Sequence, residues 1–259
     1  MRPAHLLLAI CWLCVADPAV TEDWKLLNGE HFLIFYLEDD TFAQEVLRHA
    51  ERYYDNIASD LGYSRYEKFW QWEERAKIYV YQTREEFIQA TGSAKWIGGF
   101  AKYDEKEIIS YRWNEGFLDS LLPHELAHLI FRDFVGFRAA IPLWLDEGVA
   151  QLEEAARRKE AIGTVKKLIR EGTFIPVARL MEMDVRGERD VETVRKFYAQ
   201  AVTLVRYLVE AYGGSQFVQF CRELRDGKGL AEALSFAYPN SIGDVKELEE
   251  QWLKYYGGG

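Results

Sequence analysis

Apolar and polar residues follow two different periods along the first third of the chain, and these periods predict strands and a helix. Short runs of β-branched and aromatic residues at 31–36 and 77–81 are typical of strands. Between them, apolar residues recur three and four positions apart from Ala43 to Leu61, which predicts one long helix. The two strands and the connecting helix indicate a mixed α and β region.

Helical spacing dominates after residue 111. Two apolar runs, 99–103 and 107–111, flank a polar turn and predict a last hairpin before the change. The next helix is expected to start near Ser120, a good N-cap, so that Pro123 falls in the first turn, where its missing N–H is harmless. Further helices are predicted at 215–225, 230–236 and 241–256. This order favours an α+β fold, with an N-terminal mixed sheet lobe at 20–115 and a C-terminal helical lobe at 116–256.

Residues 1–19 have the pattern of an export signal. Arg2 supplies a positive end, and the apolar stretch from Leu6 to Ala16 is too short to span a bilayer. Small residues allow cleavage after Ala16 or Ala19. We therefore expect an extracytoplasmic protein, periplasmic or secreted, with no stable membrane span.

The cysteines change this picture little. Cleavage removes Cys11 and Cys14, so Cys221 is the one remaining thiol and no intramolecular disulfide can form. A lipid anchor at Cys11 is disfavoured because Ile10 stands where a small residue is expected. Cys221 lies on the apolar side of its predicted helix, which indicates a buried hydrophobe and not a nucleophile.

Composition and charge exclude one class of partner. The 259 residues are 49% hydrophobic, which is ample for a core that needs no disulfide. The formal net charge is −10, and a surface of this sign repels phosphate backbones. Nucleic acid is therefore not an expected partner, while the oligomeric state is not indicated.

The residues with the clearest chemistry begin at His124. Two histidines four positions apart lie one above the other on a helix, so His124 and His128 can bind one metal ion. Glu125 lies beside the first histidine and can accept a proton from a water at the metal. This spacing predicts two metal ligands and a general base.

A catalytic zinc ion needs three protein ligands and one open position. Eighteen residues separate His128 from Glu147, enough to finish one helix, turn at 134–136 and start a second helix at Pro142. The second helix would return antiparallel and bring Glu147 back to the two histidines. Glu147 is therefore the expected third ligand of Zn2+.

The motif with its spacing resembles the gluzincin branch of the zinc metallopeptidases, because the glutamate lies in a Trp-Leu-Asp-Glu-Gly run at 144–148. The flanking residues at 122–123 and 150–151 also resemble small bacterial proteins called the peptidase MA family. The resemblance implies a zincin-like fold with the active site in a cleft between the two lobes, and a peptide or protein as substrate.

The predicted hairpin precedes the helix that carries His124 and His128, called the metal helix below, and it bears on the choice of substrate. The resemblance puts the edge strand of the sheet here, and an extended peptide can pair with an edge strand. The alternative is a hairpin that only covers the core. Aminopeptidases of this branch carry a Gly-x-Met-Glu-Asn motif, whereas residues 98–101 contain no acid, so aminopeptidase specificity is not supported.

The oxyanion that forms when water attacks a peptide carbonyl needs a hydrogen-bond donor. No histidine follows Glu147 in the sequence to supply it. Tyr198 is our candidate, because it lies on a helix of the kind that packs under the site in the resembled family. Its place in a three-four apolar stripe fits a core residue as well. Asp146 and Gln151 are candidates for orienting a ligand imidazole, and both could equally be exposed.

We expect an exported zinc-dependent peptidase. One alternative is a non-catalytic cell-envelope protein that binds peptides on the same fold, although a binding groove has no need of a general base at Glu125. The other is a hydrolase of a non-peptide amide such as a cell-wall crosslink, which nothing in the residues excludes.

Overall fold

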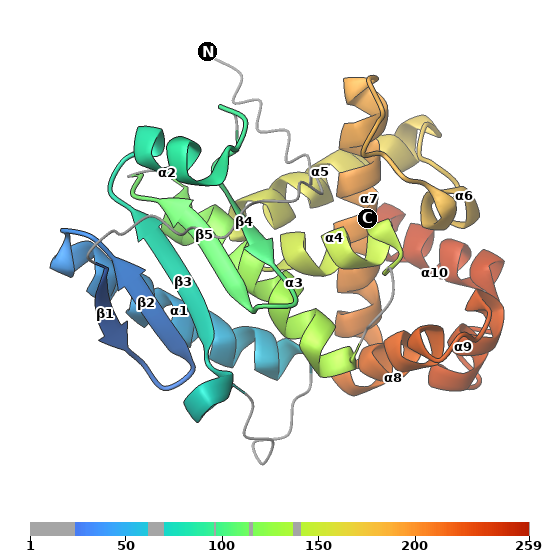
Figure 1. Cartoon of the computed structure of the whole chain (residues 1–259). Helices are drawn as coiled ribbons and strands as arrows, with labels where there is room; N and C mark the ends of the chain where they lie inside the picture. Colours follow the sequence, from blue (N-terminus) through green and yellow to red (C-terminus); the bar gives the residue numbers. More distant parts are fainter. Residues whose placement is uncertain (1–23, 62–69, 96, 114–115, 137–140, 259) are drawn as a thin grey trace. The chain divides into compact units, whose positions relative to one another are not determined.

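The structure is a computed structural model (Figure 1). It describes residues 24–61, 70–95, 97–113, 116–136 and 141–258. The predicted signal segment 1–19 lies outside these residues. The chain forms two compact units. Unit 1 comprises Met1–Tyr54 and Lys68–Glu125, and unit 2 comprises Asp55–Glu67 and Leu126–Gly259.

Unit 1 is built on a five-stranded sheet with the order β1-β2-β3-β5-β4. The strands are β1 (Lys25–Asn28), β2 (Phe32–Tyr36), β3 (Ala76–Tyr81), β4 (Gly99–Lys102) and β5 (Glu107–Tyr111). The three central strands are parallel, and each outer strand is antiparallel to its neighbour. Their register places the buried side chains of Ile34, Ile78 and Ile108 in one row. The predicted strands and hairpin are confirmed, while β1 was not predicted.

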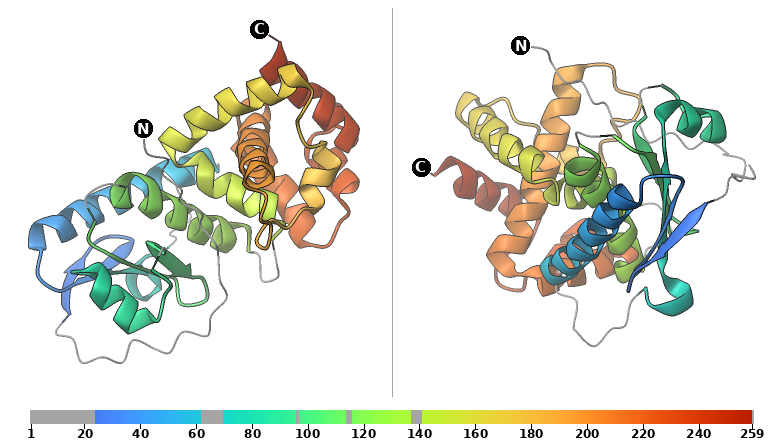
Figure 2. Two further views of the ribbon diagram at one scale, coloured as in Figure 1. Left: turned by 90° about the horizontal axis from the view of Figure 1, so that it is seen from above. Right: turned by 90° about the vertical axis from the view of Figure 1, so that its left-hand side faces the viewer.

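Helices cover both faces of this sheet (Figure 2). The described helical elements before β4 are α1 (Asp40–Asp60), the short 3-10 helix η1 (Trp72–Glu74) and α2 (Arg84–Thr91). Tyr54 of α1 meets Phe32 of β2 edge to face on one side of the sheet. Phe87 of α2 packs with Tyr81 and Ile109 on the other side. The long predicted helix is thus confirmed as α1.

The metal helix, α3 (Leu122–Val135), starts later than Ser120. A wide π-helical turn, η2 (Phe117–Leu121), precedes it. The backbone N–H groups of Ser120 and Leu121 both donate to the carbonyl of Gly116, at 3.0 and 2.9 Å. Gly116 has a φ of 99°, a conformation that favours glycine. The prediction that Ser120 caps the helix is therefore wrong, because the wide turn places Ser120 inside helical structure.

Strand β4 lies at the edge of the sheet and directly beside the start of the metal helix. A Cβ atom added to Gly99 would lie 2.7 Å from Leu121 Cδ2 and 2.8 Å from Ser110 Cβ. Only glycine permits this approach. Because Leu121 is three residues before His124, the contact ties the edge strand to the segment that carries the first predicted ligand.

Unit 2 is helical. Its remaining helices are α4 (Leu143–Leu152), α5 (Ala155–Glu171), α6 (Val177–Glu182), α7 (Val191–Tyr212), α8 (Gly214–Arg225), α9 (Leu230–Ala237) and α10 (Val245–Gly257). The last three confirm the predicted helices, although α10 starts at Val245 because Asp244 caps it. Cys221 is fully buried, as expected for a hydrophobe. Within the described part of the chain, none of the helices has the length and apolar character needed to cross a membrane.

Helix α4 packs closely against α7. A Cβ atom added to Gly148 of α4 would lie 2.8 Å from the carbonyl oxygen of Ala201 and 2.6 Å from Val205 Cγ2. The two helices therefore touch through backbone at this glycine. This contact sets the position of Glu147, the neighbouring residue, in the packed interior of unit 2.

Candidate metal centre

Helices α3 and α4 bring the three predicted ligands together. One ligand atom from each of His124, His128 and Glu147 lies within 4.8 Å of the others. The three residues are 2%, 1% and 1% exposed. Buried ionisable groups are costly unless they are bonded, and two imidazoles with a carboxylate are a donor set typical of catalytic zinc. The donor set and its spacing fit a zinc ion, and the role of each residue as a ligand stays a prediction.

Asp146 holds one of the histidines in place. Its Oδ1 lies 2.8 Å from His128 Nδ1, and its other oxygen pairs with Arg132. Burial raises the pKa of Asp146, but the positive charges of His128 and Arg132 outweigh burial and lower it. An ionised Asp146 accepts the Nδ1 proton, so Nε2 is the ring atom with which His128 could bind a metal ion.

The contact fits the predicted role of Asp146 in orienting a candidate ligand, and that role stays a prediction. Gln151 is buried as well, but the oxygen on His128 comes from Asp146. Arg132, which our sequence reasoning missed, is four residues after His128 on α3. That spacing puts both side chains on one face of the helix, so a signal for this pairing was present in the sequence.

Glu125 follows His124 on α3 and is 6% exposed. The structure therefore places the predicted general base beside the first predicted ligand, at a buried position. A carboxylate here can accept the proton of a water bound between it and a metal ion.

Tyr198 lies on the side of α7 that faces α4. It is three residues before Ala201, which touches α4 at Gly148, so the two α7 residues share one face. Burial raises the pKa of the Tyr198 hydroxyl, and the charge of Glu147 raises it further. The hydroxyl therefore keeps its proton over the working pH range and can donate a hydrogen bond.

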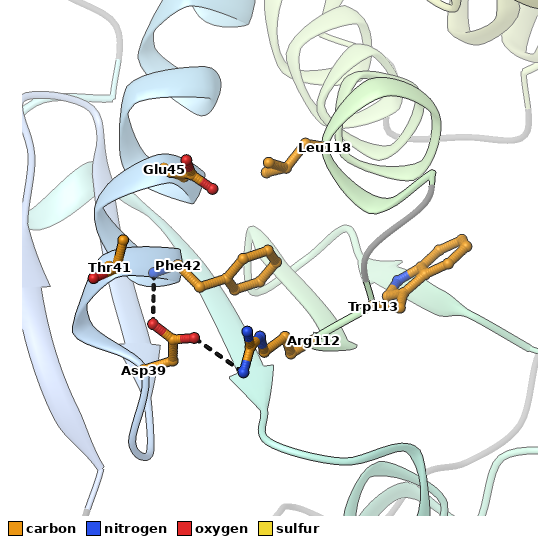
Figure 3. A pocket seen from close by; sticks show the side chains of 7 residues that line it. All are labelled: Asp39, Thr41, Phe42, Glu45, Arg112, Trp113 and Leu118. Atoms are coloured by element: carbon orange, nitrogen blue, oxygen red, sulfur yellow. Dashed lines mark hydrogen bonds and ion pairs between the residues drawn. The ribbon is translucent and has the colours of Figure 1, made fainter.

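A shallow pocket lies elsewhere in unit 1 and has a volume of about 210 Å³. Its lining residues are Asp39, Thr41, Phe42, Glu45, Arg112, Trp113 and Leu118. Asp39 pairs with Arg112 at 3.0 Å and accepts a hydrogen bond from the Phe42 N–H at 2.9 Å (Figure 3). The charge of Arg112 is thus already paired with that of Asp39. None of the predicted site residues lines this pocket.

The fold and the site together define a class. Two histidines one helical turn apart and a glutamate from the next helix, on a mixed sheet followed by helices, are the features of zincin metallopeptidases. The model of the Peptidase MA superfamily matches residues 70–257. This chain belongs to the Peptidase MA superfamily.

Two solved structures are also similar to the chain. The M1 zinc metallopeptidase from Deinococcus radiodurans matches at 16% identity and a TM-score of 0.44, over 92% of this chain and 52% of that chain. A point mutant of an M1 zinc metallopeptidase from the same organism matches at 15% identity, with the same TM-score and coverage. This chain therefore spans about half the length of these structures. No curated protein matches it.

Proposed function

We propose that this chain is an exported zinc-dependent peptidase, with zinc held by His124, His128 and Glu147. The observation that carries the proposal is that these three buried side chains lie together and that the carboxylate of Asp146 is hydrogen-bonded to His128 Nδ1. A carboxylate behind a ligand imidazole fixes its tautomer and raises its basicity, which a histidine in an ordinary core does not need.

The residues around the ligands supply the proton transfers. When bound, zinc would lower the pKa of its water to about 7 and polarise the scissile carbonyl. Glu125 accepts the proton of the attacking water and later passes it to the leaving amine. Tyr198, protonated over the working pH range, donates a hydrogen bond to the oxyanion.

A peptide is the proposed substrate because of strand β4. Among the described strands β4 pairs with β5 alone, so an extended peptide could be added as a strand along its other edge. Gly99 of β4 contacts Leu121, which precedes the metal ligands on the chain. An extended peptide that pairs with β4 would thus be held beside the helix that carries His124 and Glu125.

Glu125→Gln tests the proposal directly. The variant keeps the side-chain shape and the metal ligands, so it should retain zinc and lose hydrolysis of a pool of internally quenched peptides. His124→Ala should lose both, and Tyr198→Phe should retain zinc with a lower kcat. Hydrolysis by Glu125→Gln at the native rate would refute the assignment. Peptide binding by the zinc-loaded native chain without cleavage would favour the peptide-binding alternative.

Export is proposed from the sequence of residues 1–19. Expression with this segment in a bacterial host should give a shortened chain in the periplasm or medium. Intact mass should place the new N-terminus after Ala16 or Ala19. A full-length chain that stays in the cytoplasm would contradict the proposal.

A further inference from the structure

A fixed arginine lies on the connection between α6 and α7 in unit 2. Arg186 Nε donates to both carboxylate oxygens of Asp184, at 2.8 and 2.9 Å, and its Nη2 also pairs with Asp184. The backbone N–H of Arg186 donates to the same carboxylate at 3.0 Å. These bonds lower the pKa of Asp184 to about 2, so the pair persists at any working pH. The guanidinium is therefore held by one edge.

The backbone around this pair is also fixed. Val185, between the two charged residues, is buried, and its carbonyl accepts a hydrogen bond from the N–H of Glu188 at 3.1 Å. The Glu188 carboxylate in turn accepts from the N–H of Asp190, the cap of α7. Arg186 is thus tied to the start of α7 and not carried on a loosely held loop.

The connection that carries Arg186 joins two helices that both pack against α4, the helix of Glu147. Helix α6 packs against α4 and α7. The hydrogen bond to Asp184 is the largest cause that raises the pKa of Arg186, and the charges of Glu147 and Asp146 raise it too. Arg186 likewise acts on the Tyr198 hydroxyl. The side chain of Arg186 is nevertheless 53% exposed, so solvent and ligands reach it.

The chemistry of the open edge selects an anion. In the described part of the chain Arg186 Nη1 has no hydrogen-bond partner, and Asp184 occupies the Nε side. A guanidinium has a planar fork of donors that matches a carboxylate. A chain of net charge −10 thus offers a rigid, exposed cation within electrostatic range of Glu147 and Tyr198.

We propose that Arg186, positioned by Asp184, binds a carboxylate of the peptide substrate next to the candidate metal centre. The inference rests on the proposed function and adds a substrate class, peptides with a carboxylate close to the scissile bond. The carboxylate comes either from the C-terminus of the peptide or from an aspartate or glutamate side chain. Asp184 is a positioning residue in this proposal, because it acts through Arg186.

Binding is measured separately from hydrolysis. The zinc-loaded Glu125→Gln variant is incubated with a defined pool of short peptides, each with a free or amidated C-terminus and with Glu or Gln at each position. Retained peptides are counted by mass spectrometry. The carboxylate form should be retained about tenfold better than its neutral partner, as expected for one charge-assisted pair at an exposed position.

Substitutions test the arginine. Arg186→Gln in the same background should remove the preference, and Asp184→Asn should reduce it by a smaller factor. Arg189→Gln is the matched control, because it removes an exposed arginine from the same connection and should keep the preference. Zinc content and circular dichroism establish that each variant is folded. If Arg186→Gln removes the preference for a free over an amidated C-terminus, the carboxylate is that of the C-terminus. If it removes the preference for Glu over Gln, the carboxylate is that of a side chain.

A preference that survives Arg186→Gln, or equal retention of acid and neutral peptides, would overturn the inference. Failure to retain any peptide would overturn it as well. The proposed function is judged apart from this, by cleavage of the same pool with the native chain. Cleavage without a carboxylate preference sinks the inference alone, and an Arg186-dependent preference without cleavage sinks the proposed function alone.

Discussion

Replacing Gly148 by alanine should loosen α4 from α7 and displace Glu147. The added Cβ would lie 2.6 Å from Val205 Cγ2 and 2.8 Å from the Ala201 carbonyl, whereas ordinary contact begins at 3.4 Å. Because one of these atoms is backbone, α4 has to move. Overpacking of this kind costs about 1–3 kcal/mol, and the better helix propensity of alanine returns at most about 1 kcal/mol.

The net loss of about 0–2 kcal/mol corresponds to a decrease in Tm of up to about 8 °C for a chain of this size. The assay is urea unfolding at equilibrium, followed by zinc titration, since the displaced Glu147 should also weaken zinc binding. Gly163→Ala on α5 is the control. No atom lies within 4 Å of the Cβ added there, so that variant should be about 0.5–1 kcal/mol more stable. Gly148→Ala with the stability and zinc affinity of Gly163→Ala would refute the reasoning.

Two further predictions concern the buried carboxylate of Asp146 and the half-buried carboxylate of Glu153. Asp146→Asn should weaken zinc binding about 10- to 100-fold in competition with a chelator, because it no longer orients His128; unchanged affinity would exclude that role. Burial and the charge of Asp60 raise the pKa of Glu153 from 4.5 to about 7. The contribution of protonated Glu153 to the free energy of unfolding is therefore fully present below pH 4.5 and is lost as the pH rises through about 7. In urea unfolding, the free energy of unfolding of Glu153→Gln minus that of the native chain should increase between pH 5 and 8. A difference that stays constant over this range would contradict the prediction.

Elements that bury one regular face could be predicted from the sequence. Helix α1 and strands β2 and β3 have apolar residues at helical or strand spacing, because each packs one face into the core of unit 1. The ligands could be predicted for a related reason. His124 and His128 are one helical turn apart, so local geometry alone brings them together.

The missed elements bury too little to leave a pattern. In β1 none of the four side chains is fully buried, and α2 buries only Phe87 and Thr91. Helix α2 did carry a local signal, because Thr83 and Glu86 form a capping box.

Contacts between residues far apart in the sequence explain why the proposed carboxylate-binding pair could not be predicted. Asp184 and Arg186 are exposed and lie some forty residues from Glu147 in the sequence, so no periodicity relates them to the ligands. The connection that carries them joins α6 to α7, and both of these helices pack against α4. The late start of α3 was missed because Gly116 begins a wide turn, which a capping rule for Ser120 does not foresee.

Zinc content tests the central claim most directly. The native chain, His128→Ala and His49→Ala are loaded with zinc, passed through a chelating column and measured by elemental analysis. His49 serves as the control because it lies on α1 and outside the ligand cluster. We predict one zinc ion per chain for the native protein and for His49→Ala, and none for His128→Ala. A native chain that takes up no zinc, or a His128→Ala variant that keeps it, would contradict a metal centre at His124, His128 and Glu147.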